Sequence, residues 1–231
     1  MSFSEKNWLI ITSGFAPVYT KADFNSPCVT DAVYGESCQV LDQENTWFNV
    51  KCEDGYTGWI KSFYGSISAE KNKPTHVVAF PDKNGEFKPY CPFGSKVTEN
   101  LPGSILITDR LGLDQIIPVA KNLLGIPYRW GGKTSMGSDC SGLVQTAFAS
   151  VQIWLPRDAY QQEGFCEQLE ISKTDFQCLE PGDLLFFGAS QMCRHVGIYR
   201  GESCYWHSSG LSHGRDGIEC DCLEVTDINT V

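Results

Sequence analysis

The stretch GSDCSGLVQTAFA, residues 137–149, places a cysteine between small polar residues and an apolar helical pattern. Apolar side chains from Leu143 to Val151 recur at helical spacing, which predicts a helix that begins at or near Cys140. A thiol at a helix start lies close to unpaired backbone N–H groups and to the positive end of the helix dipole, and both lower the pKa of a thiol. Of the 11 cysteines in the chain, only Cys140 has this context, and it is the predicted nucleophile.

The residues beside Cys140 fit this interpretation. Asp139 or Ser138 is expected to cap the helix, and Gly142 leaves room for a substrate near the sulfur. A cysteine taken alone is more often structural than catalytic, so the assignment depends on a base elsewhere in the chain.

Two of the four histidines provide that base. His195 opens HVGIYRG and His207 lies in CYWHSSG, and Gly201 and Glu202 between them are turn residues. In a hairpin centred near Gly201 the two histidines have the same parity, so they are predicted to lie on one face, close to directly opposite each other. We expect His195 to take the thiol proton and His207 to fix the tautomer of His195. Each histidine alone is more often structural, but the pair together with Cys140 favours catalysis.

The composition is that of an ordinary soluble globular protein. The 231 residues are 42% hydrophobic and 20% charged, with a formal net charge of -10. No cluster of Lys and Arg is present, so neither nucleic acid nor an anionic membrane is an expected partner. The cysteines are irregularly spaced without C-x-x-C, so we expect free thiols, no metal and no cofactor. Without a signal-peptide pattern the chain is expected to be cytoplasmic, and we expect a monomer.

The chain divides by pattern into three parts. Residues 1–66 contain short alternating runs with Asp54 and Gly55 as a hairpin turn, which is typical of a small β-barrel. Residues 67–105 are rich in Pro, Lys, Asn and Gly around one strand candidate, and we interpret them as a connector with stray strands; a second, degenerate barrel is the alternative. Residues 106–231 place helical patterns before strand patterns, which predicts an α+β domain of helices packed on an antiparallel sheet.

Six linked motifs of the second half resemble the NlpC family of papain-like peptidases, which cut cell-wall peptides. In chain order they are GIPYRWGG, SDCSGLVQTAF, LPRDAYQQ, LEPGDLLFF, HVGIYRG and HSSG. The opening of the chain, from APVYTK to GYTGWI, is similar to the bacterial SH3-like domain. The arrangement most resembles two-domain γ-D-glutamyl-diaminopimelate endopeptidases, notably the cyanobacterial type that trims free murein peptides inside the cell.

The resemblance implies a catalytic triad of Cys140, His195 and His207. It implies hydrolysis of the bond between γ-D-Glu and the diamino acid in murein peptides of the L-Ala-γ-D-Glu-diaminopimelate type with an unblocked L-Ala amine. The positions that it implies for substrate binding are Tyr128, Asp139, Ser141, Asp158, Glu36 and Tyr64.

The chemistry of these side chains suits such a substrate. A free ammonium is best bound by a partly desolvated carboxylate, which Asp139 and Glu36 supply. Ser141 and Tyr128 can donate hydrogen bonds to the D-Glu α-carboxylate. The backbone N–H of Cys140, at a helix start, is the expected oxyanion donor.

The sequence leaves two other functions open. A papain-like thiol acyltransferase would use the same cysteine and histidine, but it needs a long apolar acyl-binding patch, for which we see no candidate near the motifs. A non-catalytic wall-peptide-binding protein would take its affinity from the SH3-like half. The intact triad residues favour the peptidase.

Overall fold

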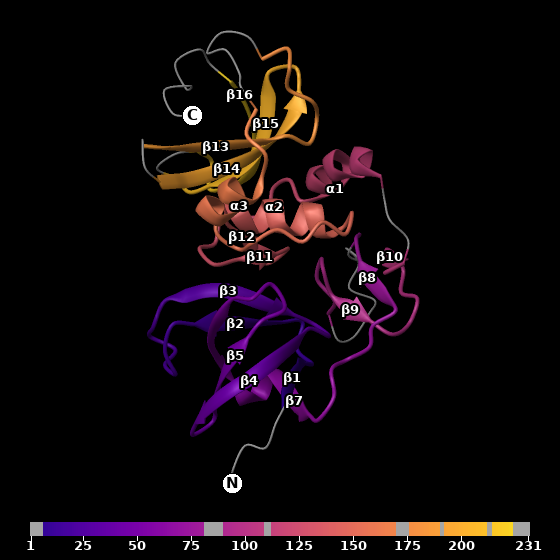
Figure 1. Ribbon diagram of the computed structural model, residues 1–231, viewed down its shortest axis with the longest axis vertical. Coiled ribbons are helices and arrows are strands. Elements are labelled where there is room, and N and C mark those ends of the chain that lie inside the picture. Colours follow the sequence, from indigo (N-terminus) through magenta and orange to yellow (C-terminus); the bar gives the residue numbers. More distant parts are fainter. Residues whose placement is uncertain are drawn as a thin grey trace. The chain divides into compact units, whose positions relative to one another are not determined.

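The computed structural model describes residues 7–80, 90–108, 112–169, 176–189, 192–211 and 214–223. The chain forms two compact units, shown with their elements in Figure 1. Unit 1 comprises Met1–Arg110 and Trp130–Thr134, and unit 2 comprises Leu111–Arg129 and Ser135–Val231. None of the helices in the described ranges is long and apolar enough to cross a membrane.

Unit 1 is built on a seven-stranded antiparallel sheet with the order β3-β2-β6-β5-β4-β1-β7. Its strands are β1 (Trp8–Ile11), β2 (Phe15–Tyr19), β3 (Cys28–Val33), β4 (Ser37–Glu44), β5 (Trp47–Lys51), β6 (Thr57–Lys61) and β7 (Gly65–Ser68), with a 3-10 turn, η1 (Ser62–Tyr64), before the last. Asp54 and Gly55 join β5 to β6, and Gly55 has a φ of 87°. The predicted hairpin turn is therefore present, because a left-handed turn position favours glycine.

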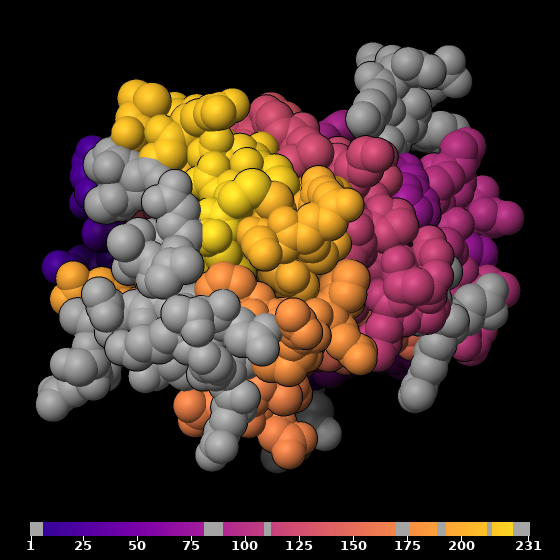
Figure 2. Space-filling model, turned by 90° about the horizontal axis from the view of Figure 1, so that it is seen from above, coloured from indigo at the N-terminus to yellow at the C-terminus, as the bar shows by residue number. Residues whose placement is uncertain are grey.

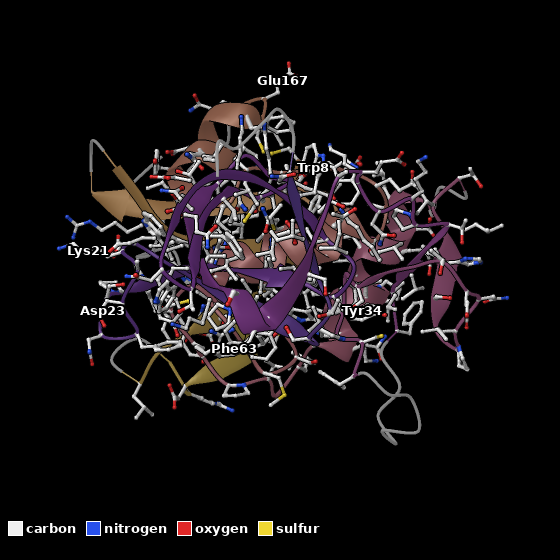
Figure 3. All side chains as sticks on the ribbon, turned by 90° about the horizontal axis from the view of Figure 1, so that it is seen from below. Trp8, Lys21, Asp23, Tyr34, Phe63 and Glu167 are labelled. Atoms are coloured by element: carbon white, nitrogen blue, oxygen red, sulfur yellow. A yellow bond between two sulfur atoms is a disulfide. The ribbon has the colours of Figure 1, made fainter. Side chains whose placement is uncertain are left out.

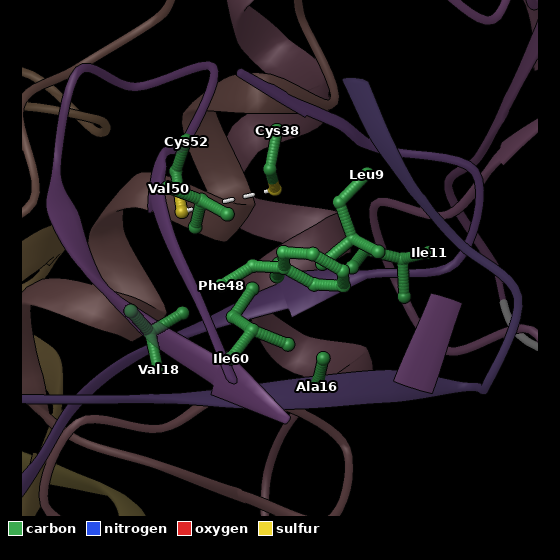
Figure 4. Close-up of a cluster of buried hydrophobic side chains, with 10 residues drawn as sticks. Leu9, Ile11, Ala16, Val18, Cys38, Phe48, Val50, Cys52 and Ile60 are labelled. Carbon is green, nitrogen blue, oxygen red and sulfur yellow. Dashed lines mark hydrogen bonds between the residues drawn. The ribbon is translucent and has the colours of Figure 1, made fainter. Parts of the chain in front are cut away.

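Alternating burial along the strands gives unit 1 its own core (Figure 4). Strands β1 and β2 bury every second residue, as a half-buried sheet requires. The buried side chains come from β1 to β6 and from Cys52 just after β5: Leu9, Ile11, Ala16, Val18, Ala32, Cys38, Phe48, Val50, Cys52 and Ile60. Two thiols lie in this core, with the Cys38 and Cys52 sulfurs 3.9 Å apart.

The boundary predicted at residue 66 and the connector predicted for residues 67–105 differ from the structure. Strand β7 continues to Ser68, and a separate three-stranded antiparallel sheet follows it in the order β10-β8-β9. Its strands are β8 (His76–Val78), β9 (Lys96–Val97) and β10 (Ser104–Leu106). Val77, Val78 and Phe93 are buried there. The strand candidate in this segment, residues 75–80, contains β8, whereas β9 and β10 are too short for a periodic signal.

Unit 2 has the predicted α+β fold, with helices packed on an antiparallel sheet. The sheet is a meander of the order β13-β14-β15-β16, and α2 and α3 both pack against β14 (Figure 1). The helical elements are η2 (Leu113–Gln115), α1 (Ile116–Asn122), α2 (Cys140–Ala149) and α3 (Ala159–Phe165). The strands are β12 (Gly137–Ser138), β13 (Leu184–Ala189), β14 (Met192–Gly201), β15 (Cys204–Ser209) and β16 (Gly217–Cys222), and a further strand, β11 (Lys133–Thr134), belongs to unit 1.

The β14–β15 hairpin is shifted from the predicted register. Its turn lies at Glu202 and Ser203, with φ values of 57° and 55°, and the register changes between Tyr199 and Gly201. Ile198 pairs with Trp206, so His195 and His207 are diagonal neighbours and not directly opposite. A bulge adds a residue to one strand and so moves every later pairing. The two histidines still lie on the same face of the sheet, because the register is shifted from the predicted one by two residues.

A disulfide joins Cys204 to Cys222, which pair directly across β15 and β16. This corrects the expectation of free thiols throughout the chain. The spacing of the cysteines did not predict this disulfide, because a cross-strand bridge depends on strand register and not on a local motif.

We predict that Gly35→Ala lowers the free energy of unfolding by about 2–4 kcal/mol, through left-handed strain and a steric clash. Gly35 has a φ of 76°, and a Cβ there would overlap the carbonyl oxygen of Lys96. Gly94 is the matched control, because its φ is 81° but a Cβ would meet nothing within 4 Å. Gly94→Ala should cost about 1 kcal/mol. Equal losses in urea unfolding would contradict the role of the Lys96 carbonyl.

Candidate active site

Cys140 is the first residue of α2, as the sequence predicts. Asp139 is the N-cap, and its Oδ1 accepts a hydrogen bond of 2.8 Å from the backbone N–H of Gly142. This carboxylate satisfies one of the unpaired donors of the first helical turn. Of the two expected caps, the structure therefore selects Asp139, whereas the hydroxyl of Ser138 donates to the carbonyl oxygen of Asp139.

The sulfur of Cys140 lies against β14. Hydrogen bonds with the backbones of Val196 and Ser141 stabilise its thiolate form. Val196 directly follows His195, so the predicted nucleophile bonds to the backbone of the residue next to the expected base. The side chain of Val196 is fully buried.

The pKa of Cys140 is raised to about 11, contrary to the low value expected at a helix start. Burial of the thiol is the largest cause, and the negative charge of Asp139 is the second. The two backbone hydrogen bonds and the positive charge of Arg157 lower it again, but by less. The resting nucleophile is therefore a neutral thiol at neutral pH, and it needs a base to become reactive.

The two histidines form a hydrogen-bonded pair. His195 Nε2 and His207 Nδ1 are 2.8 Å apart, and the rings meet edge to face with centroids 5.0 Å apart. His207 is only 3% exposed and lies beside the ring of Tyr205. His195 packs near Phe187, at 5.8 Å between ring centroids. The structure thus brings together the base and the orienting residue that the sequence proposed.

Asp221 extends this pair and was missed by the sequence analysis. Its Oδ2 lies 3.1 Å from His207 Nε2, on the far side of the ring from His195. Asp221 is on β16, and the CDC stretch that contains it carries no local sign of contact with a histidine. Only the pairing of β15 with β16 brings the two together.

Arg157 is the second residue that the sequence analysis missed. Its guanidinium is 1% exposed and forms hydrogen bonds of 3.0 and 2.7 Å with the two carboxylate oxygens of Asp139. It also donates to Ser141 Oγ at 2.9 Å. A buried bidentate pair of this kind holds both partners in one orientation. Asp139 and Ser141, both predicted to bind substrate, are therefore fixed by one buried cation.

Tyr128 belongs to the same surroundings. Its pKa is raised to about 12, first by burial and then by the negative charges of Asp139 and Cys140. Its phenol therefore keeps its proton at neutral pH and can act as a hydrogen-bond donor. The backbone N–H of Tyr128 donates to the carbonyl of Asp216, which holds this segment of unit 2 in place.

Asp158 has a structural role in the fold. It is the N-cap of α3, and its backbone N–H donates to Gln161 Oε1 at 3.3 Å in a capping box. The next turn of the helix supports the nucleophile, because Gln162 Nε2 donates to the carbonyl oxygen of Ser141 at 3.1 Å. A substrate role for Asp158 stays a prediction.

Glu36 and Tyr64 lie in unit 1. The carboxylate of Glu36 is buried and accepts hydrogen bonds from the backbone N–H groups of Val33 and Glu53, so it fixes the chain there. Tyr64 packs against Phe63, whose ring is labelled in Figure 3 and is 65% exposed. Their substrate roles stay predictions.

Two groups of side chains in the described part of the chain bring three metal-binding atoms within 4.8 Å of one another. The first is Glu36, Cys38 and Cys52, and the second is His207, Glu219 and Asp221. The oxygens of Glu36 and Asp221 already take part in the hydrogen bonds described above. Glu219 accepts from the backbone of Arg215 at 2.7 Å. We assign neither group to a metal.

Comparison with known proteins agrees with this geometry. The profile of the NlpC/P60 family matches residues 125–224, and that of the bacterial dipeptidyl-peptidase SH3 domain matches residues 18–62. Dipeptidyl-peptidase 6 of Lysinibacillus sphaericus is 27% identical over 248 residues, which cover 87% of this chain and 87% of that protein. Gamma-D-glutamyl-L-lysine dipeptidyl-peptidase of Bacillus subtilis (strain 168) is 26% identical and covers 78% of this chain and 71% of its own length.

Two further likenesses are shorter or weaker. Murein DD-endopeptidase MepS/Murein LD-carboxypeptidase of Escherichia coli (strain K12) is 37% identical over 115 residues, which cover 49% of this chain and 56% of that protein. The crystal structure of an NlpC/P60 family protein from Bacillus cereus ATCC 10987 is 21% identical, with a TM-score of 0.44, and covers 96% of this chain and 59% of that one. By the two profile matches, residues 18–62 form a bacterial SH3 domain and residues 125–224 an NlpC/P60 domain, and the latter contains Cys140, His195 and His207.

Proposed function

We propose that the protein is a cysteine endopeptidase that hydrolyses the bond between γ-D-Glu and the diamino acid of free murein peptides with an unblocked N-terminal L-Ala. The observation that carries this proposal is the hydrogen-bonded pair His195–His207, together with a cysteine at a helix start that bonds to the backbone of Val196, the residue after His195. Two of the relatives are named for γ-D-glutamyl-L-lysine dipeptidyl-peptidase activity, which supports the same bond.

The high pKa of Cys140 shapes the chemistry of the first step. The thiol proton moves to His195 Nδ1 as the sulfur lone pair attacks the γ-carbonyl carbon, because a neutral thiol is a weak nucleophile. The carbonyl electrons move onto oxygen, where the Cys140 backbone N–H stabilises the oxyanion; one such donor contributes about 10²–10³-fold in rate. The imidazolium then protonates the leaving amine, and a thioester remains.

Hydrolysis of the thioester completes the cycle. Water gives a proton to His195 and attacks the thioester carbon, and the thiol is regenerated with the D-Glu γ-carboxylate as product. His207 holds the His195 ring in one orientation during both halves of the reaction, because it bonds to Nε2 at 2.8 Å. The sequence of steps needs no cofactor.

The Asp139–Arg157 pair suits the L-Ala-γ-D-Glu end of the substrate. Asp139 offers negative charge to the L-Ala ammonium, and Arg157 with the Ser141 and Tyr128 hydroxyls offers donors to the D-Glu α-carboxylate. Burial of the ion pair strengthens the interaction between the two charges and holds both side chains in one orientation. Glu36 stays a second candidate for the ammonium.

The place of action is also a proposal. A cytoplasmic location fits the trimming of free peptides, and intact wall polymer would then not be the substrate. The disulfide Cys204–Cys222 is the feature that weighs against it, because disulfides are rare in reducing compartments. The redox state of Cys204 and Cys222, measured on protein isolated from each cellular compartment, tests the location.

A thiol acyltransferase is the second candidate, and one observation favours it. Unit 2 contains a cavity of about 650 Å³ between α3 and β13, lined mainly by apolar side chains such as Leu155, Phe165 and Leu185. Phe187 lines it too and packs near His195. This cavity is a candidate for the apolar acyl-binding patch that such an enzyme needs. Mass analysis of Cys140 after incubation with acyl-lipid donors distinguishes this reaction from hydrolysis.

We predict that Cys140→Ala abolishes cleavage of L-Ala-γ-D-Glu-diaminopimelate while far-UV circular dichroism stays that of wild type. Removal of the sulfur removes the acyl-enzyme route. Cys166→Ala, at the C-terminal end of α3, is the matched control and should keep wild-type turnover. Products identified by mass spectrometry check the bond that is cut. Full turnover by Cys140→Ala would disprove the proposal.

We predict that a peptide with an acetylated L-Ala is cut at least about tenfold more slowly than the free peptide. The lost ammonium forfeits a charge-assisted interaction of about 1.5–3 kcal/mol. The measurement is kcat/KM for the two matched peptides. Equal values would remove Asp139 and Glu36 from substrate recognition and leave the triad untouched.

We predict that Asp139→Asn lowers the pKa of Cys140, because it removes a negative charge that disfavours the thiolate. The side-chain oxygen of asparagine can still cap α2. The rate of Cys140 alkylation by iodoacetamide, followed against pH, should have its midpoint at lower pH than in wild type. Asp158→Asn, which removes the other helix-capping carboxylate, should leave the midpoint in place. A midpoint that rises in Asp139→Asn would contradict the assignment.

A further inference from the structure

Three side chains from three neighbouring strands form a continuous hydrogen-bonded row. His195 on β14 bonds through Nε2 to His207 Nδ1 on β15 at 2.8 Å, and His207 bonds through Nε2 to Asp221 Oδ2 on β16 at 3.1 Å. The middle ring is 3% exposed, whereas the side chain of Asp221 is 42% exposed. A buried imidazole is thus held between a second imidazole and a carboxylate that reaches solvent.

The carboxylate determines where every proton of the row must be. An ionised carboxylate only accepts hydrogen bonds, so the proton between Asp221 and His207 must be on His207 Nε2. Nδ1 of neutral His207 then has a lone pair and can only accept, so the proton of the 2.8 Å bond must be on His195 Nε2. Neutral His195 is left with its lone pair on Nδ1.

We propose that Asp221 is a positioning residue that selects the tautomer of His195 with the unprotonated nitrogen at Nδ1. This role rests on the proposed function, because Nδ1 is the atom that accepts the Cys140 proton there. The opposite tautomer of His207 would direct the Nε2 lone pair at the carboxylate, 3.1 Å away. That tautomer would reverse the row and place a proton on His195 Nδ1, where it blocks the transfer, and the repulsion from the carboxylate disfavours it.

The same row stabilises the charged intermediate. When the Cys140 proton arrives at Nδ1, His195 becomes an imidazolium that still donates from Nε2 to His207, and His207 still donates to Asp221. No further proton moves, and the sulfur keeps the electron pair of the broken S–H bond. The negative charge of Asp221 acts on the imidazolium through the buried His207 ring, and the solvent that reaches the carboxylate screens part of this effect.

A second carboxylate beside the row provides an internal control. Glu219 lies on β16 two residues before Asp221, and its oxygen is within 4.8 Å of both His207 Nε2 and the Asp221 carboxylate. It accepts instead from the Arg215 backbone at 2.7 Å and pairs with the Arg215 side chain at 3.2 Å. Strand β16, which carries both carboxylates, reaches the surface of unit 2 (Figure 2, yellow). Removing the Glu219 charge therefore changes the local charge without touching the row.

The test compares wild type with Asp221→Ala, Asp221→Asn and Glu219→Gln. Asparagine keeps an acceptor without the charge, whereas alanine removes both. We expect kcat/KM for L-Ala-γ-D-Glu-diaminopimelate to fall about tenfold or more in Asp221→Ala, less in Asp221→Asn, and less than twofold in Glu219→Gln. This is below the roughly 10⁴-fold loss when the carboxylate next to a catalytic histidine is replaced in a serine hydrolase. Wild-type kcat/KM in Asp221→Ala would overturn the proposal.

A direct spectroscopic measurement separates positioning from a general loss of structure. In two-dimensional ¹⁵N NMR of histidine-labelled protein at neutral pH, wild type should show His195 and His207 both protonated at Nε2 only. Asp221→Ala should show a proton on Nδ1 in a fraction of the molecules, and Glu219→Gln should match wild type. A wild-type His195 protonated at Nδ1 would overturn the proposal. These spectra need no substrate, so a wild type that fails to cut the peptide would refute the proposed function while the tautomer is still read.

Discussion

The buried ion pair between Asp139 and Arg157 is the interaction on which the active site of unit 2 depends. One carboxylate caps the helix that begins with Cys140, accepts two hydrogen bonds from the guanidinium and raises the pKa of the neighbouring thiol. The same guanidinium holds the hydroxyl of Ser141. A buried charge without its partner is costly, so neither residue can be lost alone without disturbing the start of the helix.

This arrangement changes how the nucleophile is prepared. The start of a helix favours an anion, but burial and the adjacent carboxylate oppose it more strongly at Cys140. The resting Cys140 therefore keeps its proton on sulfur. In the proposed mechanism the thiolate forms only when proton transfer and attack on the carbonyl occur together, which protects the thiol from unwanted reactions while no substrate is bound.

The sequence predicted the local elements well and the long-range contacts less well. Apolar periodicity located α2, and equal parity placed His195 and His207 on one face even though the bulge near Gly201 moved their register. Arg157 and Asp221 were missed, because each meets its partner from a separate segment and no local pattern records the contact. In the small sheet, β8 coincides with a strand candidate, whereas β9 and β10 were missed because they have only two and three residues.

The low thiol pKa was wrong for a related reason. Helix position can be read from a sequence, but the degree of burial and the distance to a charge depend on the whole fold. The free-thiol expectation failed similarly at Cys204 and Cys222, whose pairing is a product of strand register.

That disulfide has a mechanical consequence. Cys204 and Cys222 are 18 positions apart in the sequence, and the segment between them contains His207 and Asp221. If a protease were to cut the connection between β15 and β16, the covalent bridge would still tether the two fragments, so the clipped enzyme could retain the histidine and aspartate in register. The disulfide therefore protects the strands that carry His207 and Asp221 against the effect of a single backbone cut.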